Sequence, residues 1–385
     1  MRIMRILICA IIFAFWINGA GICAESVKIG VTLGLTGKYA EMSDMIQKGF
    51  SIWQEKVNSS GGLLGRRVEL IIYDDHSDGE QAKKLYEQLI VQDRVDHLFG
   101  PYSSDITAAI LPVTEKYAFP LLLTGAASDK LWQQGYQYAF GIFIPASRYC
   151  VGFLEMLATK GFKDTAIVFA DDNFSTSIAQ GTKQWGDKIG LENKLYEQFK
   201  KGTRDLTGLA QKAKASGAKA LIVCGHLEES VDMRRAMKEI GWHPEAYFAT
   251  VGPAMDAYQD QLGEDGDFAF SSSQWEPTVM FQENDHRIFL KPFMEKYDKQ
   301  PTYHAAQAFA VGQVLEAAIN RANSLDRKKI QELLSTMDAM SIIGRYKVDR
   351  TGMQIRHFQV TIQRQKGKKE IVWPGSLATA APIFQ

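Results

Sequence analysis

Two serines lie where this chain can receive a negatively charged group. Ser104 and Ser128 each come shortly after an apolar stretch and precede a predicted helix. A hydroxyl and the free backbone N–H groups at a helix start can together hold a carboxylate. Capping of those helices is the alternative interpretation, because serine is a preferred N-cap residue. Gly125 lets the backbone of the second loop approach a ligand closely.

Aromatic side chains and one histidine occupy comparable loops. Tyr39, Tyr102 and Phe174 each lie in a loop after a predicted strand, where they can form apolar walls around a ligand. Packing at the surface or at a hinge is the alternative for each of them. His226 can donate a hydrogen bond to a ligand oxygen, and a purely structural role is its alternative.

Patterns typical of enzymes, nucleotide binding and metal sites are weak in this sequence. It contains no Gly-x-Ser-x-Gly motif and no Walker-type loop, and its 7 histidines lack the spacing of metal ligands. Asp74, Asp75 and Asp78 could form a cation site, but a solvated strand end and helix start is the preferred interpretation. We therefore expect no catalytic residue, no metal ion and no cofactor.

The elements that position these loops alternate between strand and helix. Apolar, β-branched stretches predict strands, and recurrent apolar residues at helical spacing predict the helices between them. Ser43 is the expected N-cap of the first helix, which the segment 58–62 ends. The predicted strands are 27–33, 68–73, 95–99, 119–124, 165–170, 220–224 and 246–250, and the clearest later helix is 303–322.

The C-terminal part carries a different pattern. Tyr346–Val348 and Phe358–Gln363 have strand character and flank a turn at Asp349–Gly352. This pattern predicts a hairpin near the end of the chain.

The strand pattern indicates the fold class. Strands that are apolar throughout, separated by amphipathic helices, predict parallel sheets covered on both faces. A chain of 385 residues is too long for one compact core and suits two lobes. We therefore predict an α/β protein with two doubly wound parallel-sheet lobes. Ligands of open parallel sheets bind beyond the C-terminal ends of the strands, which is where the loops above lie.

The first 24 residues have the order of charge, apolar core and small residues that is typical of a cleaved signal peptide. Arg2 and Arg5 precede an apolar run over residues 6–17. That run is shorter than the roughly 20 residues that span a bilayer. We therefore expect export to the periplasm and no membrane insertion after cleavage.

Cleavage is expected after Ala24, with Ala20 as the alternative. A lipid anchor at Cys23 is the less favoured option, because the bulky Ile22 precedes it. Removal of residues 1–24 changes the formal charge from 0 to −2, because it takes away two arginines and no acids. A charge near zero argues against a nucleic-acid partner, which favours a basic face.

Two cysteines remain after such a cut, Cys150 and Cys224. An export compartment permits a bridge between them. Two buried free thiols are the preferred interpretation.

Several short motifs, in this order and spacing, resemble one known family. The chain resembles the type 1 periplasmic binding proteins that serve branched-chain amino acid and related ABC transporters, over nearly all residues after 24. The motifs that carry the resemblance are Lys28–Val31, Leu35–Gly37, Val57–Gly65, Tyr73–Asp75, Phe99–Ser104, Gly135–Phe140, Gln274–Pro277 and Tyr303–Ala308.

The resemblance implies two lobes joined by three crossovers that close on a ligand like a hinged trap. One lobe would be 25–145 plus 275–344, and the other 146–274 plus 345–385. Ser104 and the loop 125–127 would hold the ligand carboxylate, and aromatic residues would close over the rest. The candidate ligand-binding residues are Tyr39, Tyr102, Ser103, Ser104, Thr124, Gly125, Ala126, Ala127, Phe174, His226 and Val251.

Two departures from the family pattern bear on the ligand. Ala127 stands in place of a threonine, although Thr124 and Ser128 lie close in sequence. Val251 stands where amino-acid binders place the acid that pairs with the ligand ammonium. A buried ammonium without a partner is unfavourable, which favours a carboxylate lacking an α-amine. Asp171 and Asp172 would restore amine binding if they point inward.

The expected function is capture of a small carboxylate, an amino acid or a related aliphatic or aromatic acid, for delivery to the permease of an ABC transporter. The protein is expected to act as a monomer. A ligand sensor of the same fold and a binder of amide- or urea-type ligands are the alternatives. An enzyme ranks last, because the loops contain no recognisable nucleophile–base pair.

Overall fold

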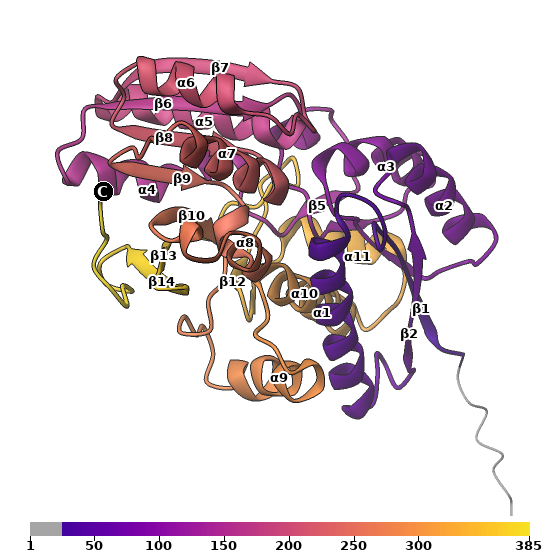
Figure 1. The fold of residues 1–385 in the computed structure, drawn as a ribbon. Helices are drawn as coiled ribbons and strands as arrows, with labels where there is room; N and C mark the ends of the chain where they lie inside the picture. The colour runs from indigo at the N-terminus through magenta and orange to yellow at the C-terminus, as the bar shows by residue number, and fades with distance from the viewer. Residues whose placement is uncertain (1–24) are drawn as a thin grey trace, which may run out of the picture.

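The computed structural model describes residues 25–385, and its first strand, β1 (Val27–Leu33), lies within a five-stranded sheet (Figure 1). The strand order is β2-β1-β3-β4-β5, and all neighbouring pairs are parallel. Lys28 is the one residue of β1 that is not fully buried, as expected of a strand covered on both faces. The other strands are β2 (Val68–Asp74), β3 (His97–Phe99), β4 (Leu121–Leu123) and β5 (Ala139–Gly141). This sheet and its helices are called lobe 1.

A second sheet has seven strands, in the order β14-β13-β10-β9-β8-β6-β7. The five strands β10, β9, β8, β6 and β7 pair in parallel. Strand β13 is antiparallel to both of its neighbours, β10 and β14. The strands are β6 (Asp164–Ala170), β7 (Glu192–Phe199), β8 (Ala220–Cys224), β9 (Ala246–Ala249), β10 (Ala269–Ser273), β13 (Val360–Gln365) and β14 (Lys368–Trp373). This sheet and its helices are called lobe 2.

Helix α1 (Ala40–Ser59) and helix α10 (Tyr303–Ala322) pack tightly in lobe 1, although they are far apart in sequence. A Cβ atom at Gly49 would lie 2.1 Å from the carbonyl oxygen of Ala305, so only glycine allows this approach. The other elements of lobe 1 are α2 (Gly79–Val91), α3 (Ser104–Lys116), α9 (Lys291–Tyr297), α11 (Arg327–Thr336), β11 (Ala339–Ser341) and β12 (Gly344–Tyr346).

Helices cover lobe 2 as well. Helix α5 (Asn173–Ile189) begins at Asp172, whose side chain accepts hydrogen bonds from the N–H groups of Phe174 and Ser175. It ends at Gly190, which adopts the left-handed conformation of a helix C-cap. The other helices are α4 (Val151–Thr159), α6 (Thr207–Ala215), α7 (Leu227–Glu239) and α8 (Asp256–Leu262), and a 3-10 turn spans Ala146–Arg148.

The chain passes between the two sheets after β5, after β10 and before β13 (Figure 1). Gln274, in the second passage, ties these segments together. Its Oε1 accepts hydrogen bonds from Ile144 N at 3.0 Å and from Gln307 Nε2 at 2.8 Å. Its Nε2 donates to the Tyr149 hydroxyl at 2.6 Å. The two-lobed fold is as predicted, and the stated lobe boundaries remain a prediction.

Two details of the sequence prediction are wrong. Helix α1 begins at Ala40, so Ser43 is a buried residue within the helix and not its cap. Tyr346 belongs to β12, which pairs with β11 immediately before it and not with the segment 358–363. The C-terminal hairpin joins β13 to β14 through Lys366 and Gly367, which both have positive φ, as a tight hairpin turn requires.

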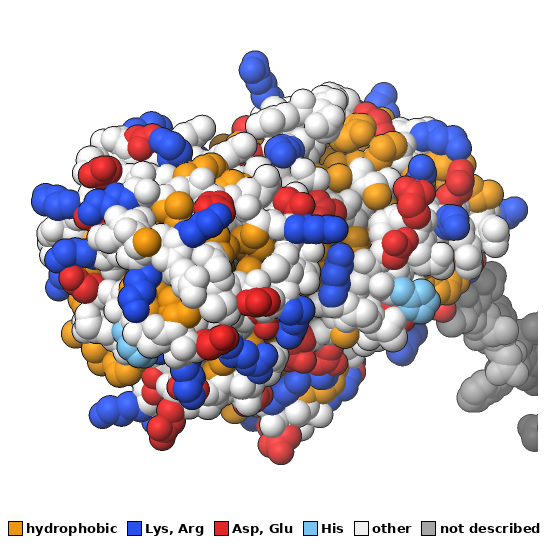
Figure 2. Space-filling view, turned by 45° about the horizontal axis from the view of Figure 1, so that its top comes forward, with side chains coloured by type: hydrophobic (Ala, Val, Ile, Leu, Met, Phe, Trp, Pro, Cys, Tyr) orange, Lys and Arg blue, Asp and Glu red, His pale blue; other side chains and the backbone are white. Residues whose placement is uncertain are grey.

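The surface of the molecule mixes both charges. On the face drawn in Figure 2, basic and acidic side chains are interspersed, in keeping with the near-zero net charge. Among residues 25–385, no helix is long and apolar enough to cross a membrane. Cys150 and Cys224 are both buried free thiols, as preferred from the sequence. The predicted signal peptide, including Cys23, lies outside the described residues.

Candidate ligand-binding site

Loops from both lobes meet around one enclosed cavity, called the cleft cavity. In this conformation, the volume open to the centre of a water molecule is about 10 Å³. The total volume not filled by atoms is about 230 Å³. The space is therefore closed around at most a very small guest. Its lining residues are Tyr102, Ser103, Ser104, Gly125, Phe143, Tyr149, Phe174, His226, Val251, Tyr303 and His304.

The Ser104 hydroxyl is held by the neighbouring loop. Its oxygen accepts hydrogen bonds from the backbone N–H of Ala127 at 3.2 Å and of Ser128 at 3.1 Å. A hydroxyl has two lone pairs and one proton. Both lone pairs are thus used, and the proton is left to donate toward the cleft cavity. A carboxylate oxygen is a natural acceptor for it.

The backbone before Ser104 is strained. Ser103 has φ of 87°, a left-handed value that is unfavourable for a residue with a Cβ atom. Such strain costs about 1–3 kcal/mol and persists where the surroundings fix the backbone. Here Ser103 N donates to Gly125 O at 3.1 Å, and Tyr102 and Gly125 form a parallel bridge. This arrangement holds both strand-end loops against the cavity.

Aromatic rings form most of the remaining wall. Tyr102 from lobe 1 and His226 from lobe 2 form a hydrogen bond of 3.1 Å between the hydroxyl and Nδ1. Phe174 contacts both Tyr149 and His226, with ring centroids 5.2 and 5.1 Å apart. The cavity is therefore a ring-lined space whose walls come from both lobes.

Two imidazoles that line the cavity carry ring nitrogens without a hydrogen-bond partner in the described residues. Nε2 of His226 and Nδ1 of His304 are buried and have no hydrogen-bond partner among residues 25–385. Burial lowers the pKa of His304 to about 3, so its ring is neutral near pH 7. Buried polar atoms of this kind are usually satisfied by water or a ligand.

Lys201 reaches across the cleft from the loop after β7. Its Nζ donates to the Tyr39 hydroxyl at 2.6 Å and lies 3.5 Å from Asp105, both in lobe 1. It also lies 3.4 Å from Asp172 in its own lobe. One ammonium thus bridges the two lobes beside the cavity.

The charges of this bridge stabilise one another. Burial by itself would raise the pKa of Asp172, but His226 and Lys201 outweigh it and hold that pKa well below its usual range. Burial would likewise lower the pKa of Lys201, but Tyr39 and Asp172 raise it above its usual range. His226 Nε2 lies 3.7 Å from the Asp172 carboxylate, too far for a hydrogen bond.

Further hydrogen bonds join lobe 1 to the start of α5. The Ser128 hydroxyl donates to Asn173 O at 3.0 Å and lies 2.7 Å from the Ser177 hydroxyl. The backbone N–H of Asn173 donates to Asp105 at 3.2 Å. Ser128 is thus not a side-chain cap of its own helical turn, because its hydroxyl is used across the cleft.

The structure brings most of the sequence-predicted site residues to the cavity. Thr124, Ala126 and Ala127 are buried behind the wall, with Ala127 acting through its N–H group. Tyr39 lies behind Tyr102 and His226, with ring centroids 5.2 and 5.3 Å away. The residues that do line the cavity are Tyr102, Ser103, Ser104, Gly125, Phe174, His226 and Val251.

Sequence reasoning missed several site residues. Phe143, Tyr149, Tyr303 and His304 line the cavity, and Lys201 spans the cleft. Tyr303 and His304 begin helix α10, within a motif that carried the family resemblance. An aromatic pair at a helix start was the available signal, but no local pattern links it to strands some 200 residues earlier.

Among the residues that the structure describes, 25–385, no acidic side chain lines the cleft cavity. Asp172 is close, but its carboxylate accepts from Phe174 N, Ser175 N and the Ser175 hydroxyl, and it attracts Lys201. A ligand ammonium would therefore be buried without a free counter-charge. The donors and rings present suit a small acid with an apolar body.

Comparison with known proteins gives a consistent result. A family model described as "Periplasmic binding protein" matches residues 26–368. The Leu/Ile/Val-binding protein homolog 7 of Brucella suis biovar 1 is 25% identical, over 96% of each chain. Among solved structures, a leucine binding protein from Thermotoga maritima has a TM-score of 0.82 at 20% identity, covering 90% of this chain and 97% of that one. A solute binding protein of R. palustris in complex with benzoate has a TM-score of 0.77 at 18% identity, covering 93% and 97%.

Proposed function

The chain belongs to the periplasmic binding protein family, and we propose that it captures a small carboxylate between its lobes and delivers it to an ABC transporter. The observation that carries this proposal is the Ser104 hydroxyl, whose lone pairs are occupied and whose proton is free to donate at the cleft cavity. His226 and His304 add polar atoms without partners at the same cavity. These groups favour an anionic or strongly accepting guest.

The ligand we propose is an aliphatic or aromatic acid without an α-ammonium group. Relatives of this chain are named for leucine, isoleucine and valine, and one neighbouring structure holds benzoate. Val251 and the absence of an acid from the cavity lining favour a ligand that, like benzoate, has a carboxylate and no ammonium group. The rings of Phe143, Phe174 and Tyr303 suit an apolar or aromatic body.

Binding is proposed to proceed by hinge closure. The closed cavity has room for little more than a water molecule, so a ligand of several heavy atoms requires the lobes to separate further. Lys201 and Ser128 supply contacts that hold the lobes together in this conformation and that must yield when a ligand enters. Movement about the three crossovers is the expected hinge motion.

Matched ligand pairs test the proposal. Calorimetry would compare 3-phenylpropionate with L-phenylalanine, and 4-methylpentanoate with L-leucine, because each pair differs by one ammonium group. The acid should bind more tightly in each pair, by roughly tenfold or more. Tighter binding of the amino acids would overturn the proposed ligand class, and loss of the carboxylate in 3-phenylpropanamide should abolish binding.

We further propose that the exported protein acts as a monomer in the periplasm and binds rather than transforms its ligand. Recovery of unchanged ligand after prolonged incubation is the expected result, and a new product would overturn this part. Cross-linking to the cognate permease, increased by ligand, would support delivery to a transporter. Cross-linking to a regulator alone would favour the sensor alternative.

A further inference from the structure

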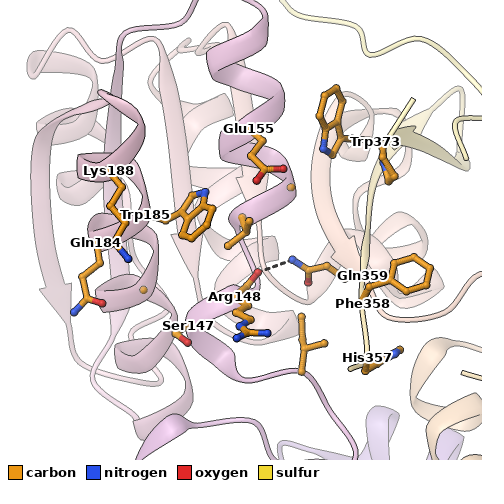
Figure 3. Close-up of a pocket in the computed structure, with 15 residues that line it drawn as sticks. Ser147, Arg148, Glu155, Gln184, Trp185, Lys188, His357, Phe358, Gln359 and Trp373 are labelled. Carbon is orange, nitrogen blue, oxygen red and sulfur yellow. Dashed lines mark hydrogen bonds between the residues drawn. The ribbon is translucent and has the colours of Figure 1, made fainter. Parts of the chain in front are cut away.

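A second cavity, called the hinge pocket, lies in lobe 2 beside the crossovers (Figure 3). The volume of this pocket that is open to the centre of a water molecule is about 610 Å³. Its walls come from the turn before α4, from α4 and α5, and from segments 357–359 and 373–374. The residues that define it here are Arg148, Glu155, Trp185, Phe358, Gln359 and Trp373. Nothing in the proposed function uses them.

Aromatic side chains stand on opposite sides of the hinge pocket. Figure 3 shows Trp185 of α5 on one side, and Phe358 and Trp373 on the other. Lys188 lies over the Trp185 ring, with Nζ 5.5 Å from the centroid. Indole faces on two walls can hold a flat ring between them.

Three charged side chains line the pocket, and none of them forms a salt bridge within residues 25–385. They are Arg148, Glu155 and Lys188, of which Lys188 lies over Trp185. Arg148 ends the 3-10 turn before α4 and Glu155 lies seven positions later on α4, so their backbones are roughly 10 Å apart along the helix direction. Figure 3 places Glu155 toward one end of the pocket and Arg148 toward the other. A guest with two separated charges can meet both.

Two residues that line the pocket, Trp185 and Gln359, carry buried polar atoms without a hydrogen-bond partner in the described residues. Gln359 Nε2 donates to Arg148 O at 2.7 Å and to Tyr149 O at 2.6 Å, which joins the third crossover to the first (Figure 3). Its Oε1 and the Nε1 of Trp185 are buried without a partner in the described residues. Buried polar atoms without partners are uncommon and often mark a place for water or ligand.

We propose that the hinge pocket binds a small aromatic zwitterion whose two charges are farther apart than those of an α-amino acid. Its ring lies between Trp185 and Trp373, its acidic group meets Arg148, and its basic group meets Glu155. The cleft cavity, which has no acid in its lining, takes a different ligand. The two sites are therefore expected to bind ligands of different charge.

Derivatives of one dipeptide test this site. Calorimetry would compare glycyl-L-tryptophan with its N-acetyl form, which lacks the amine charge, and with its C-terminal amide, which lacks the acid charge. The free dipeptide should bind more tightly than either blocked form, by roughly tenfold for each lost charge pair. Equal binding of all three would overturn the proposal.

Substitutions assign each charge to its partner. Arg148→Ala should remove the advantage of the free carboxylate, and Glu155→Gln the advantage of the free amine. Arg350→Ala and Glu283→Gln change exposed residues elsewhere and serve as matched controls without effect. Both test residues lie at the surface or partly exposed, so the variants should fold.

A cleft variant separates this site from the proposed function. Ser104→Ala should leave dipeptide binding unchanged, because Ser104 lines only the cleft cavity. Dipeptide binding that is weakened by Ser104→Ala and not by Arg148→Ala would overturn the hinge site and place the dipeptide in the cleft. Failure of the acid ligands in the cleft would leave the dipeptide results unaffected.

Discussion

The cleft cavity and the hinge pocket differ in how their walls are held. Both lobes build the cleft cavity, and polar groups that cross the gap close it until about 10 Å³ is left for the centre of a water molecule. Lobe 2 and the crossovers build the hinge pocket, which keeps about 610 Å³ in the same conformation. The volume of the first depends on the lobe angle, and that of the second depends mainly on packing within one lobe.

The two cavities also differ in whether their charged side chains are paired. Beside the cleft, Lys201 and Asp172 neutralise each other, and no acid faces the cavity. In the hinge pocket, Arg148 and Glu155 remain apart. The buried ammonium beside the cleft is paired within its own lobe and also reaches Tyr39 and Asp105 of the other lobe, whereas the separated charges of the hinge pocket leave room for a guest.

The largest effect is expected from Lys201→Met, which removes the ammonium that bridges the cleft. It leaves the buried Asp172 carboxylate with hydrogen bonds from Phe174 and Ser175 but without its ammonium, and loss of one member of a buried pair costs about 3 kcal/mol or more. The ligand-free protein should become more open, with a larger radius of gyration in solution scattering. Lys200→Met changes an exposed neighbour and should leave the profile unchanged. An equal effect of both variants would contradict the role of Lys201.

The same variant has a pH signature. The folded pKa of Asp172 lies below its unfolded value of about 3.9, so its contribution to the free energy of unfolding is complete above that pH and is lost as pH falls through the folded pKa. Without Lys201 this loss should begin at a higher pH. Hinge-pocket binding at pH 7 should not change.

A smaller effect is expected from Ser104→Ala, which removes one donor from the cleft cavity. Affinity for the acid ligand should fall by about 1–3 kcal/mol, the range for losing one partner of a charged hydrogen bond. Because Ala127 and Ser128 also lose their acceptor, the free energy of unfolding should be measured alongside. Ser376→Ala, at an exposed serine, is the control. Unchanged affinity would exclude Ser104 from contact with the ligand.

The smallest effect is expected at Asp75, a buried aspartate outside both cavities. It accepts hydrogen bonds from the Thr32 hydroxyl at 2.7 Å and from Ser77 N at 2.9 Å, but no lysine or arginine pairs with it. Burial raises the pKa of Asp75 to about 6, the opposite direction from Asp172. The stability that its proton provides is complete below about pH 4 and is lost as pH rises through the folded pKa.

Asp75→Asn should therefore stabilise the protein by about 1–2 kcal/mol at pH 7.5 and change little at pH 4. Urea unfolding at the two pH values measures the difference. Asp78→Asn, at the N-cap of α2, is the control for the general effect of replacing an aspartate by asparagine in this segment. Equal effects of Asp75→Asn at both pH values would mean that Asp75 ionises as freely as an exposed aspartate.

The sequence by itself determined the alternation of strands and helices and the two-lobed fold. Strand β1 is apolar along its length, and α1 carries its apolar residues at helical spacing, so both are fixed by neighbours in the chain. The loops after β3 and β8 followed from that alternation, and with them the positions of Ser104 and His226. These features are local, and local patterns can be read from sequence.

Only the tertiary structure decided which distant groups meet. Lys201 belongs to a polar loop with no motif, and it reaches Tyr39 because the lobes close. Tyr303 and His304 reach the cavity because α10 packs against α1 through Gly49. The tail hairpin was mispaired for the same reason: strand character is local, but β12 and β13 take partners that depend on hydrogen bonding between segments. Charge pairing and strand pairing act through space, so residue order alone did not specify them.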